Sequence, residues 1–489
     1  MRSTILIVTA LFLGMAAYGQ GNANSKSSET YKANWKSIDS RPVPEWFTDA
    51  KFGIFIHWGV YSVPAYSKLG TYSEWYWSAL RNNNKVTNDF HNRVYGEKFA
   101  YADFVPMFNC NMFDGDQWAH IFKKSGAKYV VLTSKHHDGY CLWPSAQADK
   151  SWGRPWNTVN SGPGRDLLGE LTKSVRNTGL KMGIYYSLYE WFNPLYKNDV
   201  DLYVNKHMIP QFKDVVTRYA PSVIFSDGEW DQTDKTWRST EILSWLYNES
   251  PCKDEVVIND RWGKGLRHKH GGYYTTEYGA GLPNAENPWE ENRGMAHSFG
   301  YSINENYKDY NSTRKLIYML VDIVSRGGNF LLDIGPTADG RIPVIMQGRL
   351  LEMGDWLTVN GEAIYGTKCW ENTCQWTKGN LPQTSDKRDQ AKYDVIKLTV
   401  SPDEGMASKE IWFTTKEDDL YCICPVYPKD KLVVKNVKLK SRSKVSMLGY
   451  SENLEWKRKG KNIEIQVPYL TASEVPCSHA WVFKLSGVK

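Results

Sequence analysis

The sequence predicts an α/β protein in which a (β/α)8-like TIM barrel is followed by a C-terminal β-sandwich. From about residue 50, short β-rich segments alternate with amphipathic helical segments, which is typical of βα units around a parallel sheet. Eight candidate strands occur within roughly 320 residues, which is the strand count of a barrel. Beyond residue 365, short segments of alternating polarity are separated by turn-rich stretches, which indicates a small sandwich.

The candidate barrel strands are short runs of β-branched, aromatic and other apolar residues. They are residues 52–58, 129–134, 181–187, 222–226, 256–259, 273–277, a segment around 298–301, and 329–334. Helical periodicity is found at 116–124, 166–177, 204–218 and 312–325, whereas helices are expected to be short or missing around 255–300. A doubly wound sheet is disfavoured because neither Gly-x-Gly-x-x-Gly nor a phosphate-binding loop pattern occurs.

Three segments are predicted along the chain. Residues 1–19 combine Arg2, an apolar stretch and a small-residue end, which is typical of a cleavable secretory signal. We therefore expect export, to the periplasm or the extracellular medium. Residues 20–365 are assigned to the barrel and 366–489 to the sandwich. The sandwich strands are expected at 410–415, 421–426, 431–434, 463–467 and 480–485.

Charge and composition exclude some classes of partner. Lys and Arg number 60 against 54 Asp and Glu, without a basic run, so neither nucleic acid nor a membrane surface is expected to bind. After the signal, no stretch of eighteen apolar residues occurs, so no membrane span is expected. The eight Cys lack the spacing of a zinc site, and buried thiols are expected instead. The sequence makes no prediction of oligomeric state.

Polar residues follow most of the candidate strands, at the barrel end where reactive side chains gather. Asp227 ends the fourth strand and Glu277 the sixth, so their backbones would stand roughly 10 Å apart. Side chains that lean inward could reduce the separation of the carboxyl groups to about 5–5.5 Å, as in retaining glycosidases. Alternatively, either residue could cap a helix or pair with Arg261.

Nine short motifs occur in order between about residues 44 and 365. They are residues 46–59, 74–76, 135–140, 183–187, 226–228, 257–263, 276–278, 298–301 and 328–336. This set resembles the α-L-fucosidases of glycoside hydrolase family twenty-nine. The resemblance implies a retaining exo-α-L-fucosidase that removes terminal α-L-fucose by double displacement through a covalent fucosyl-enzyme. It further implies a fucosylated oligosaccharide or glycoconjugate as substrate, and no cofactor.

The resemblance also implies residue roles. Asp227 would be the nucleophile and Glu277 the acid/base, with Glu290 and Glu286 as alternatives for the acid/base. The implied substrate-binding residues are His57, Trp58, Glu74, Trp75, His136, His137, Tyr186, Arg261 and Phe299. No metal is expected, although His57, His136 and His137 could form a three-nitrogen site. Phe225 stands where many relatives carry Trp, and Asp333 where many carry Asn.

Other functions remain open at the level of sequence. A retaining glycosidase with a related sugar preference, such as an α-L-galactosidase, is the nearest alternative. An inactive carbohydrate-binding protein and a metal-dependent hydrolase are two further candidates. In the sandwich, Trp370, Trp376, Trp412 and Trp456 could form either its core or a sugar-binding surface.

Overall fold

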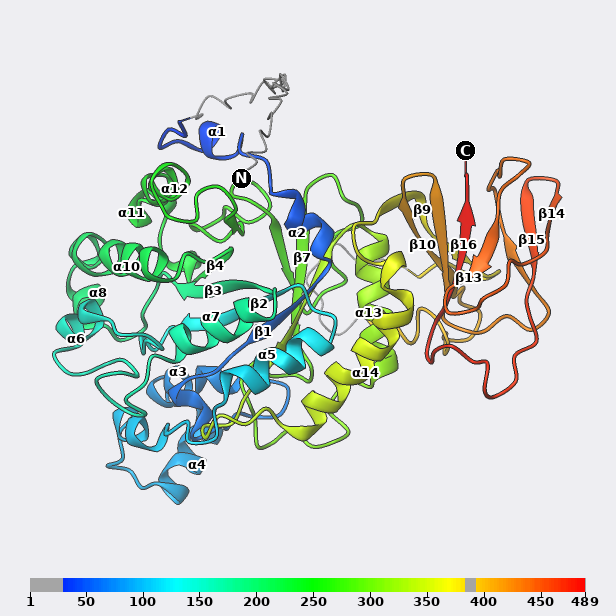
Figure 1. Cartoon of the computed structure of the whole chain (residues 1–489). Coiled ribbons are helices and arrows are strands. Elements are labelled where there is room, and N and C mark those ends of the chain that lie inside the picture. Colours follow the sequence, from blue (N-terminus) through cyan, green and yellow to red (C-terminus); the bar gives the residue numbers. More distant parts are fainter. Residues whose placement is uncertain (1–29, 383–392, 489) are drawn as a thin grey trace, which may run out of the picture.

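The computed structural model describes residues 30–382 and 393–488, so the predicted signal segment lies outside the described residues. Eight strands form one curled parallel sheet in the order β5-β4-β3-β2-β1-β8-β7-β6 (Figure 1). They are β1 (Phe52–Ile56), β2 (Tyr129–Lys135), β3 (Lys181–Ser187), β4 (Val223–Asp227), β5 (Val257–Ile258), β6 (Tyr274–Glu277), β7 (Trp289–Gly294) and β8 (Asn329–Ile334). Because each strand pairs with its neighbours in chain order, the predicted (β/α)8-like barrel is confirmed.

The barrel closes between β5 and β6 through one isolated bridge, from Asn259 to Tyr273. The Tyr273 N–H donates to the Ile258 carbonyl at 3.0 Å. Beyond the bridge, the Asp260 side chain connects the two segments, because its Oδ1 accepts from the Thr275 hydroxyl at 2.7 Å and from the Thr275 N–H at 3.2 Å. We call this junction the seam. It contains one paired position, whereas the ladder between β1 and β2 contains four.

The seventh strand lies at β7 and not around 298–301, so that part of the prediction was wrong. All six residues of β7 are buried although four of them are polar or charged. Their charges are paired, because Arg293 contacts Glu291 at 2.8 Å and the Tyr129 hydroxyl donates to Glu290. The polar composition of β7 is not typical of a buried strand, so the strand was not predicted. The segment around the apolar Phe299 in the following loop was predicted as a strand instead.

Helices surround the barrel. They are α1 (Trp35–Ile38), α2 (Glu45–Ala50), α3 (Tyr76–Arg81), α4 (Lys85–Val94), α5 (Gly115–Lys124), α6 (Ala146–Trp152), α7 (Leu167–Asn177), α8 (Pro194–Asn198), α9 (Val200–Tyr203), α10 (Ile209–Tyr219), α11 (Asp234–Trp237), α12 (Ser239–Asn248), α13 (Thr313–Ser325) and α14 (Val344–Asn360). Asp114, Asp166 and Ser312 cap the first turns of α5, α7 and α13. In the described stretch from α12 to α13 no helix intervenes, as expected. None of the described helices has the length and apolarity to cross a membrane.

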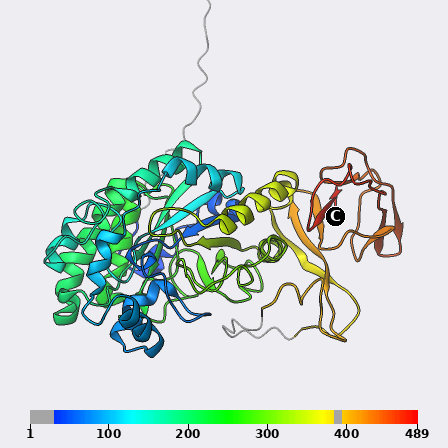
Figure 2. The same cartoon turned by 90° about the horizontal axis from the view of Figure 1, so that it is seen from below.

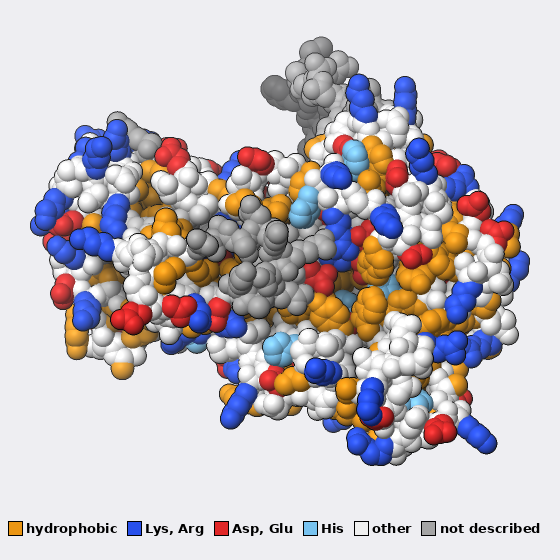
Figure 3. Space-filling model, turned by 180° about the vertical axis from the view of Figure 1, so that it is seen from behind, with side chains coloured by type: hydrophobic (Ala, Val, Ile, Leu, Met, Phe, Trp, Pro, Cys, Tyr) orange, Lys and Arg blue, Asp and Glu red, His pale blue; other side chains and the backbone are white. Residues whose placement is uncertain are grey.

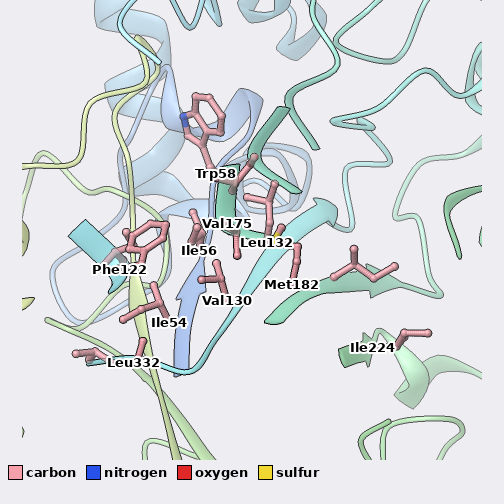
Figure 4. Close-up of a cluster of buried hydrophobic side chains, with 14 of the residues drawn as sticks. Ile54, Ile56, Trp58, Phe122, Val130, Leu132, Val175, Met182, Ile224 and Leu332 are labelled. Carbon is pink, nitrogen blue, oxygen red and sulfur yellow. The ribbon is translucent and has the colours of Figure 1, made fainter. Parts of the chain in front are cut away.

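Side chains of the barrel strands alternate between two apolar clusters. The outer cluster lies between strands and helices, where Ile54 and Val130 pack with Phe122 of α5 and Val175 of α7 (Figure 4). The inner cluster fills the barrel with residues such as Phe55, Tyr185 and Phe225. Alternate residues of a strand point to opposite faces of the sheet, so only every second side chain points into the barrel and can reach its mouth.

The C-terminal domain contains two antiparallel sheets that share one apolar core. Its strands are β9 (Lys368–Trp376), β10 (Lys409–Lys416), β11 (Asp419–Cys424), β12 (Lys431–Val434), β13 (Val445–Met447), β14 (Trp456–Lys459), β15 (Asn462–Gln466) and β16 (Trp481–Ser486). Figure 2 shows this domain beside the barrel, against α13 and α14. Trp412 is fully buried and its indole N–H donates to Asp322 of α13 at 3.0 Å, so this Trp belongs to the core between the C-terminal domain and the barrel helices.

Candidate active site

A small cavity of about 130 Å³ opens at the carboxyl ends of the barrel strands. Acidic, basic and His side chains are visible in a hollow bordered by hydrophobic ones near the middle of the face in Figure 3. Nine predicted site residues line the cavity: His57, Glu74, Trp75, His136, His137, Asp227, Arg261, Glu277 and Phe299. The fold therefore brings side chains together from segments more than two hundred residues apart in the sequence.

Asp227, the last residue of β4, has three basic side chains within 4 Å, more than the other carboxylates of the cavity. Its Oδ1 accepts from Arg261 Nη1 at 2.9 Å, and its Oδ2 accepts from the Tyr185 hydroxyl at 2.8 Å. His137 Nε2 lies 3.5 Å from Oδ2. Although burial raises the pKa of this carboxyl, Arg261, His137 and Arg267 together lower it to about 2. Asp227 is therefore ionised at neutral pH.

Glu277 ends β6 on the other side of the seam and is the more exposed of the two carboxylates. Its side chain is 26% exposed, against 12% for Asp227. The Tyr72 hydroxyl donates to Oε1 at 3.1 Å, and Arg261 Nη2 donates to Oε2 at 3.2 Å. A single guanidinium therefore binds both carboxylates and orients them toward the same cavity.

Uncharged polar groups form a further part of the wall. Burial lowers the pKa of His57 to about 3 and that of His137 to about 4, so both imidazoles are neutral at pH 7. The His136 ring lines the cavity, and its buried Nδ1 has no hydrogen-bond partner among the described residues. Burial raises the pKa of Glu74 to about 7, and this carboxyl accepts from the Gly300 N–H at 2.9 Å. Such groups suit the hydroxyls of a neutral sugar.

Aromatic rings supply the apolar surface. Phe299 stacks on His57 with ring centroids 4.8 Å apart, and Phe55 packs edge-on against the same imidazole at 4.7 Å. Trp75 and Trp230 are stacked at 6.3 Å at the mouth. Apolar surface beside polar groups is the usual composition of a small-molecule site.

Two predicted residues lie elsewhere. Trp58 is in the outer core (Figure 4), where its indole N–H donates to the Thr337 carbonyl at 2.9 Å. Tyr186 also faces outward, and its hydroxyl donates to Gln211 of α10 at 2.9 Å. Its neighbour Tyr185 reaches the cavity instead, because alternate residues of β3 point to opposite faces.

The alternative acid/base candidates do not line the cavity. Glu290 is fully buried inside the barrel beside Tyr129, and burial raises its pKa to about 8. Glu286 is exposed on the loop before β7. Of the three candidates, only Glu277 lines the cavity that contains Asp227.

Seven lining residues were not predicted as site residues: Phe55, Tyr72, Tyr185, Phe225, Trp230, Arg267 and Asn292. Tyr185 is registered beside Phe225, and Phe225 precedes Asp227 by two positions, so period-two alternation places all three on one face. Arg267 donates from Nε to Glu229 at 2.6 Å and lies 3.8 Å from Asp227. It comes from a loop, where no periodicity could have predicted its position.

His57, His136 and His137 are the three side chains that could together bind a metal ion. Their rings lie close together, with His57 and His136 centroids 5.8 Å apart. Within residues 30–382 and 393–488, no group of three or more His, Cys, Asp or Glu has the arrangement needed to hold a metal ion. All eight Cys are free thiols, five of them buried.

Comparisons with known proteins agree with one another. A family profile described as α-L-fucosidase matches residues 19–362, and one described as its C-terminal domain matches residues 404–486. The α-L-fucosidase of Dictyostelium discoideum is 49% identical over 71% of this chain and 77% of its own length. The tissue α-L-fucosidase of Homo sapiens is 40% identical over 99% of this chain and 97% of its own length.

Solved structures give the same result at the level of the fold. The crystal structure of Thermotoga maritima α-fucosidase in complex with a mechanism-based inhibitor is 35% identical. It superposes with a TM-score of 0.75 and covers 93% of this chain and 100% of its own. A second structure of the same protein, in complex with fucose, is 34% identical with a TM-score of 0.74.

Proposed function

This chain belongs to the α-L-fucosidase family and is a glycoside hydrolase, and on that premise we propose that it removes terminal α-L-fucose with retention of configuration. The substrate would be a fucosylated oligosaccharide or glycoconjugate. The reaction would pass through a fucosyl group covalently bound to Asp227. The small volume of the cavity supports an exo-acting enzyme that holds one terminal sugar.

The observation that carries the mechanism is the guanidinium of Arg261 between the two carboxylates, at 2.9 Å from Asp227 and 3.2 Å from Glu277. Retaining glycosidases need carboxyl groups about 5–5.5 Å apart, one as nucleophile and one as acid and base. Two carboxylates bound to one guanidinium are consistent with the short separation. The low pKa of Asp227 suits a nucleophile, which must be ionised before the sugar binds.

The two steps assign different tasks to the carboxyl groups. In the first, an Asp227 oxygen attacks the anomeric carbon while Glu277 donates a proton to the departing glycosidic oxygen, so the aglycone leaves as an alcohol. In the second, the Glu277 carboxylate accepts a proton from water, whose oxygen attacks the anomeric carbon and releases Asp227. Glu277 is the more exposed group and can meet both aglycone and water.

The neutral His side chains and the aromatic wall support recognition of fucose. His57, His136 and His137 would bind hydroxyls, and Phe299 with Trp75 would contact apolar parts of the ring. A methyl group in place of the hydroxymethyl of α-L-galactose would favour fucosides by roughly 1–3 kcal/mol. We also propose export, for which residues 1–19 have the composition of a secretory signal.

Azide rescue with 4-nitrophenyl α-L-fucoside tests the mechanism. We expect Asp227→Ala to be nearly inactive and to form inverted fucosyl azide, because azide takes the place of the nucleophile. Glu277→Ala should instead give the retained azide product. Glu290→Gln serves as the comparison variant, because Glu290 is a buried carboxyl outside the cavity.

Two results would contradict the proposal. Wild-type turnover by Glu277→Ala on a fucoside with a poor leaving group would move the acid to another residue. Absence of hydrolysis of any α-L-fucoside by the wild type would remove the substrate assignment.

A further inference from the structure

A second and larger cavity, of about 460 Å³, lies beside α3, α6 and α8, and the proposed mechanism does not use it. Half-buried aromatic rings form one wall. The Trp77 ring centroid lies 4.7 Å from that of Phe192 and 5.7 Å from that of Trp152. We call this cavity the aromatic groove. Its volume is within the range of about 300–1,000 Å³ that is usual for ligand sites.

The charge of the aromatic groove is predominantly positive. Arg81, Arg154 and Lys197 line it, all three exposed, whereas Glu97 is the one lining carboxylate. Asp103 interacts electrostatically with Arg154 but does not form an ion pair with it. In the described part of the chain, none of the three cations forms an ion pair or hydrogen bond with the protein. Their N–H donors are therefore available to an anion.

The cations are held against the aromatic wall. The Arg81 guanidinium lies 5.6 Å and the Lys197 ammonium 5.0 Å from the centroid of Phe192. The Arg154 guanidinium lies 4.2 Å from the centroid of Trp156. Cation–π contacts fix the position of a positive group without satisfying its hydrogen bonds. Ring faces for sugar C–H groups and donors for an acidic substituent are thus side by side.

A continuous aromatic path joins the aromatic groove to the active site. Trp75 lines the active-site cavity, and its ring lies 5.0 Å from that of Trp191. Trp191 is followed by Phe192, a lining residue of the aromatic groove. Trp75 and Trp77 are likewise two positions apart on the same stretch of chain. Trp191 is only 6% exposed, so this link runs beneath the surface. It places the wall of the active site next to the wall of the aromatic groove, so a glycan whose terminal sugar occupies the active site could extend from Trp75 toward the aromatic groove.

We propose that the aromatic groove binds an anionic oligosaccharide, in which sulfate ester or carboxylate groups contact Arg81, Arg154 and Lys197 while a sugar ring packs against Trp77. The proposal deepens the proposed function and rests on it in one respect: the bound oligosaccharide is the remainder of the fucosylated substrate. Arginine forks match sulfate and carboxylate geometry, and exposed donors with little counter-charge favour an acidic over a neutral glycan.

The test compares four substrates: 4-nitrophenyl α-L-fucoside, a fucosylated oligosaccharide with a sulfate ester next to the fucose, its desulfated form, and a uronate-containing counterpart. The groove variant is Arg81→Ala/Arg154→Ala/Lys197→Ala. The matched control is Lys123→Ala/Lys173→Ala/Lys438→Ala, which removes the same formal charge from exposed positions outside the aromatic groove. Binding of a sulfated oligosaccharide without fucose is measured separately by calorimetry at low and high salt.

We expect the wild type to prefer the sulfated over the desulfated substrate in kcat/KM by about 10-fold, with the preference falling as salt is added. The groove variant should lose this preference, and the control variant should keep it. Arg81→Glu alone should reduce it further than Arg81→Ala. A preference for the uronate substrate alone would support the proposal with carboxylate as the ligand.

Equal hydrolysis of all three oligosaccharides by the wild type, or an unchanged preference in the groove variant, would overturn the proposal. A different result would contradict the proposed function: the wild type would hydrolyse no α-L-fucoside, including 4-nitrophenyl α-L-fucoside. In that case, salt-sensitive binding of the sulfated oligosaccharide that the groove variant lacks would still support an anionic-glycan site.

Discussion

Asp227 owes its ionisation to neighbours that are themselves fixed. Arg261 is buried and bonded to Asp227, Glu277 and Thr275, so its position does not depend on a mobile side chain. Tyr185 contributes from the adjacent strand through its hydroxyl. At the scale of single residues, the chemistry of the cavity depends on one cation placed between two carboxylates.

Arg261→Gln is expected to raise the pKa of Asp227, because it removes the strongest of the charges that lower it. The proposed mechanism needs ionised Asp227, so kcat/KM should fall as the pH falls through the raised pKa. In the wild type this group stays ionised down to about pH 2. We expect a rate about 100-fold lower and an acidic limb at higher pH. Arg261→Lys, which keeps the charge, should shift the limb less; identical profiles would contradict the prediction.

Tyr185→Phe and Tyr186→Phe form a matched pair on β3. Tyr185→Phe removes a hydrogen bond to ionised Asp227, so kcat/KM should fall by about 10- to 100-fold. Tyr186→Phe removes a hydrogen bond to Gln211 outside the barrel, so activity should remain while stability falls by about 1 kcal/mol. Steady-state kinetics and urea unfolding of both variants provide the measurement. Loss of activity in Tyr186→Phe alone would reverse the assignment.

At the scale of elements, close packing between β3 and β4 fixes the position of Asp227. Gly183 of β3 pairs with Val223 of β4, and a Cβ at Gly183 would lie 2.6 Å from the Cβ of Val223 and 2.9 Å from its carbonyl oxygen. A side chain at this position would therefore push against the strand that ends in Asp227.

Gly183→Ala is expected to destabilise the fold by roughly 1–3 kcal/mol, since the clash includes backbone that cannot move aside easily. Gly348→Ala in α14 is the control, because a Cβ there meets no atom within 4 Å. That change should stabilise the helix by up to about 1 kcal/mol. Chemical unfolding of the two variants checks the contrast, and equal stability changes would contradict it.

Barrel strands could be predicted from the sequence where they are apolar runs. A strand could not be predicted where charged residues are buried by pairing with other side chains. The strands β1 to β6 and β8 were predicted to within two residues, most of them because strands of a parallel sheet are nearly continuous apolar runs. β7 was missed because its Glu and Arg residues are buried by pairing with each other and with tyrosines, which no local pattern reports.

The candidate site was predictable at the level of motifs and not of side-chain direction. Tyr185 and Tyr186 are adjacent and of the same residue type, so the sequence did not indicate which side chain faces the cavity. The pairing of Tyr185 with Phe225 in the structure identifies it. Trp58 directly follows His57, yet only His57 lines the cavity. The roles of Asp227 and Glu277 stay predictions that the azide rescue experiment tests. The domain boundaries also stay predictions.

At the scale of the whole molecule, a buried ion cluster joins the two domains. Asp322 of α13 accepts from Lys409 and Trp412 of β10, from Arg326 at 2.9 Å and from Tyr393 at 2.8 Å. Although burial raises the pKa of Asp322, these neighbours lower it below its ordinary range. The cluster therefore stabilises the fold above the ordinary pKa of the carboxyl, and this stabilisation is lost as the pH falls.

Lys409→Met is expected to destabilise the protein by about 3–5 kcal/mol, because it leaves a buried carboxylate with fewer partners. The loss should be largest near neutral pH and smaller in acid, where Asp322 becomes protonated. Lys397→Met is the control, since Lys397 pairs with Asp403 at the surface and should change stability little. Unfolding followed by Trp fluorescence and by activity measures both; equal effects of the two substitutions would contradict the prediction.

The seam has the shortest strand pairing of the barrel, with one bridge against two register pairs between β4 and β5 and at least four at each other junction. We therefore expect it to be the most compliant sector of the barrel. Asp227 and Glu277 lie on opposite sides of the seam, and the guanidinium of Arg261 binds both. We thus expect the spacing of the two carboxyl groups to adjust without breaking the ladders of the other strands. Hydrogen–deuterium exchange should accordingly be faster for amides of residues 258–277 than for those of β1 and β2, and equal protection would exclude a soft seam.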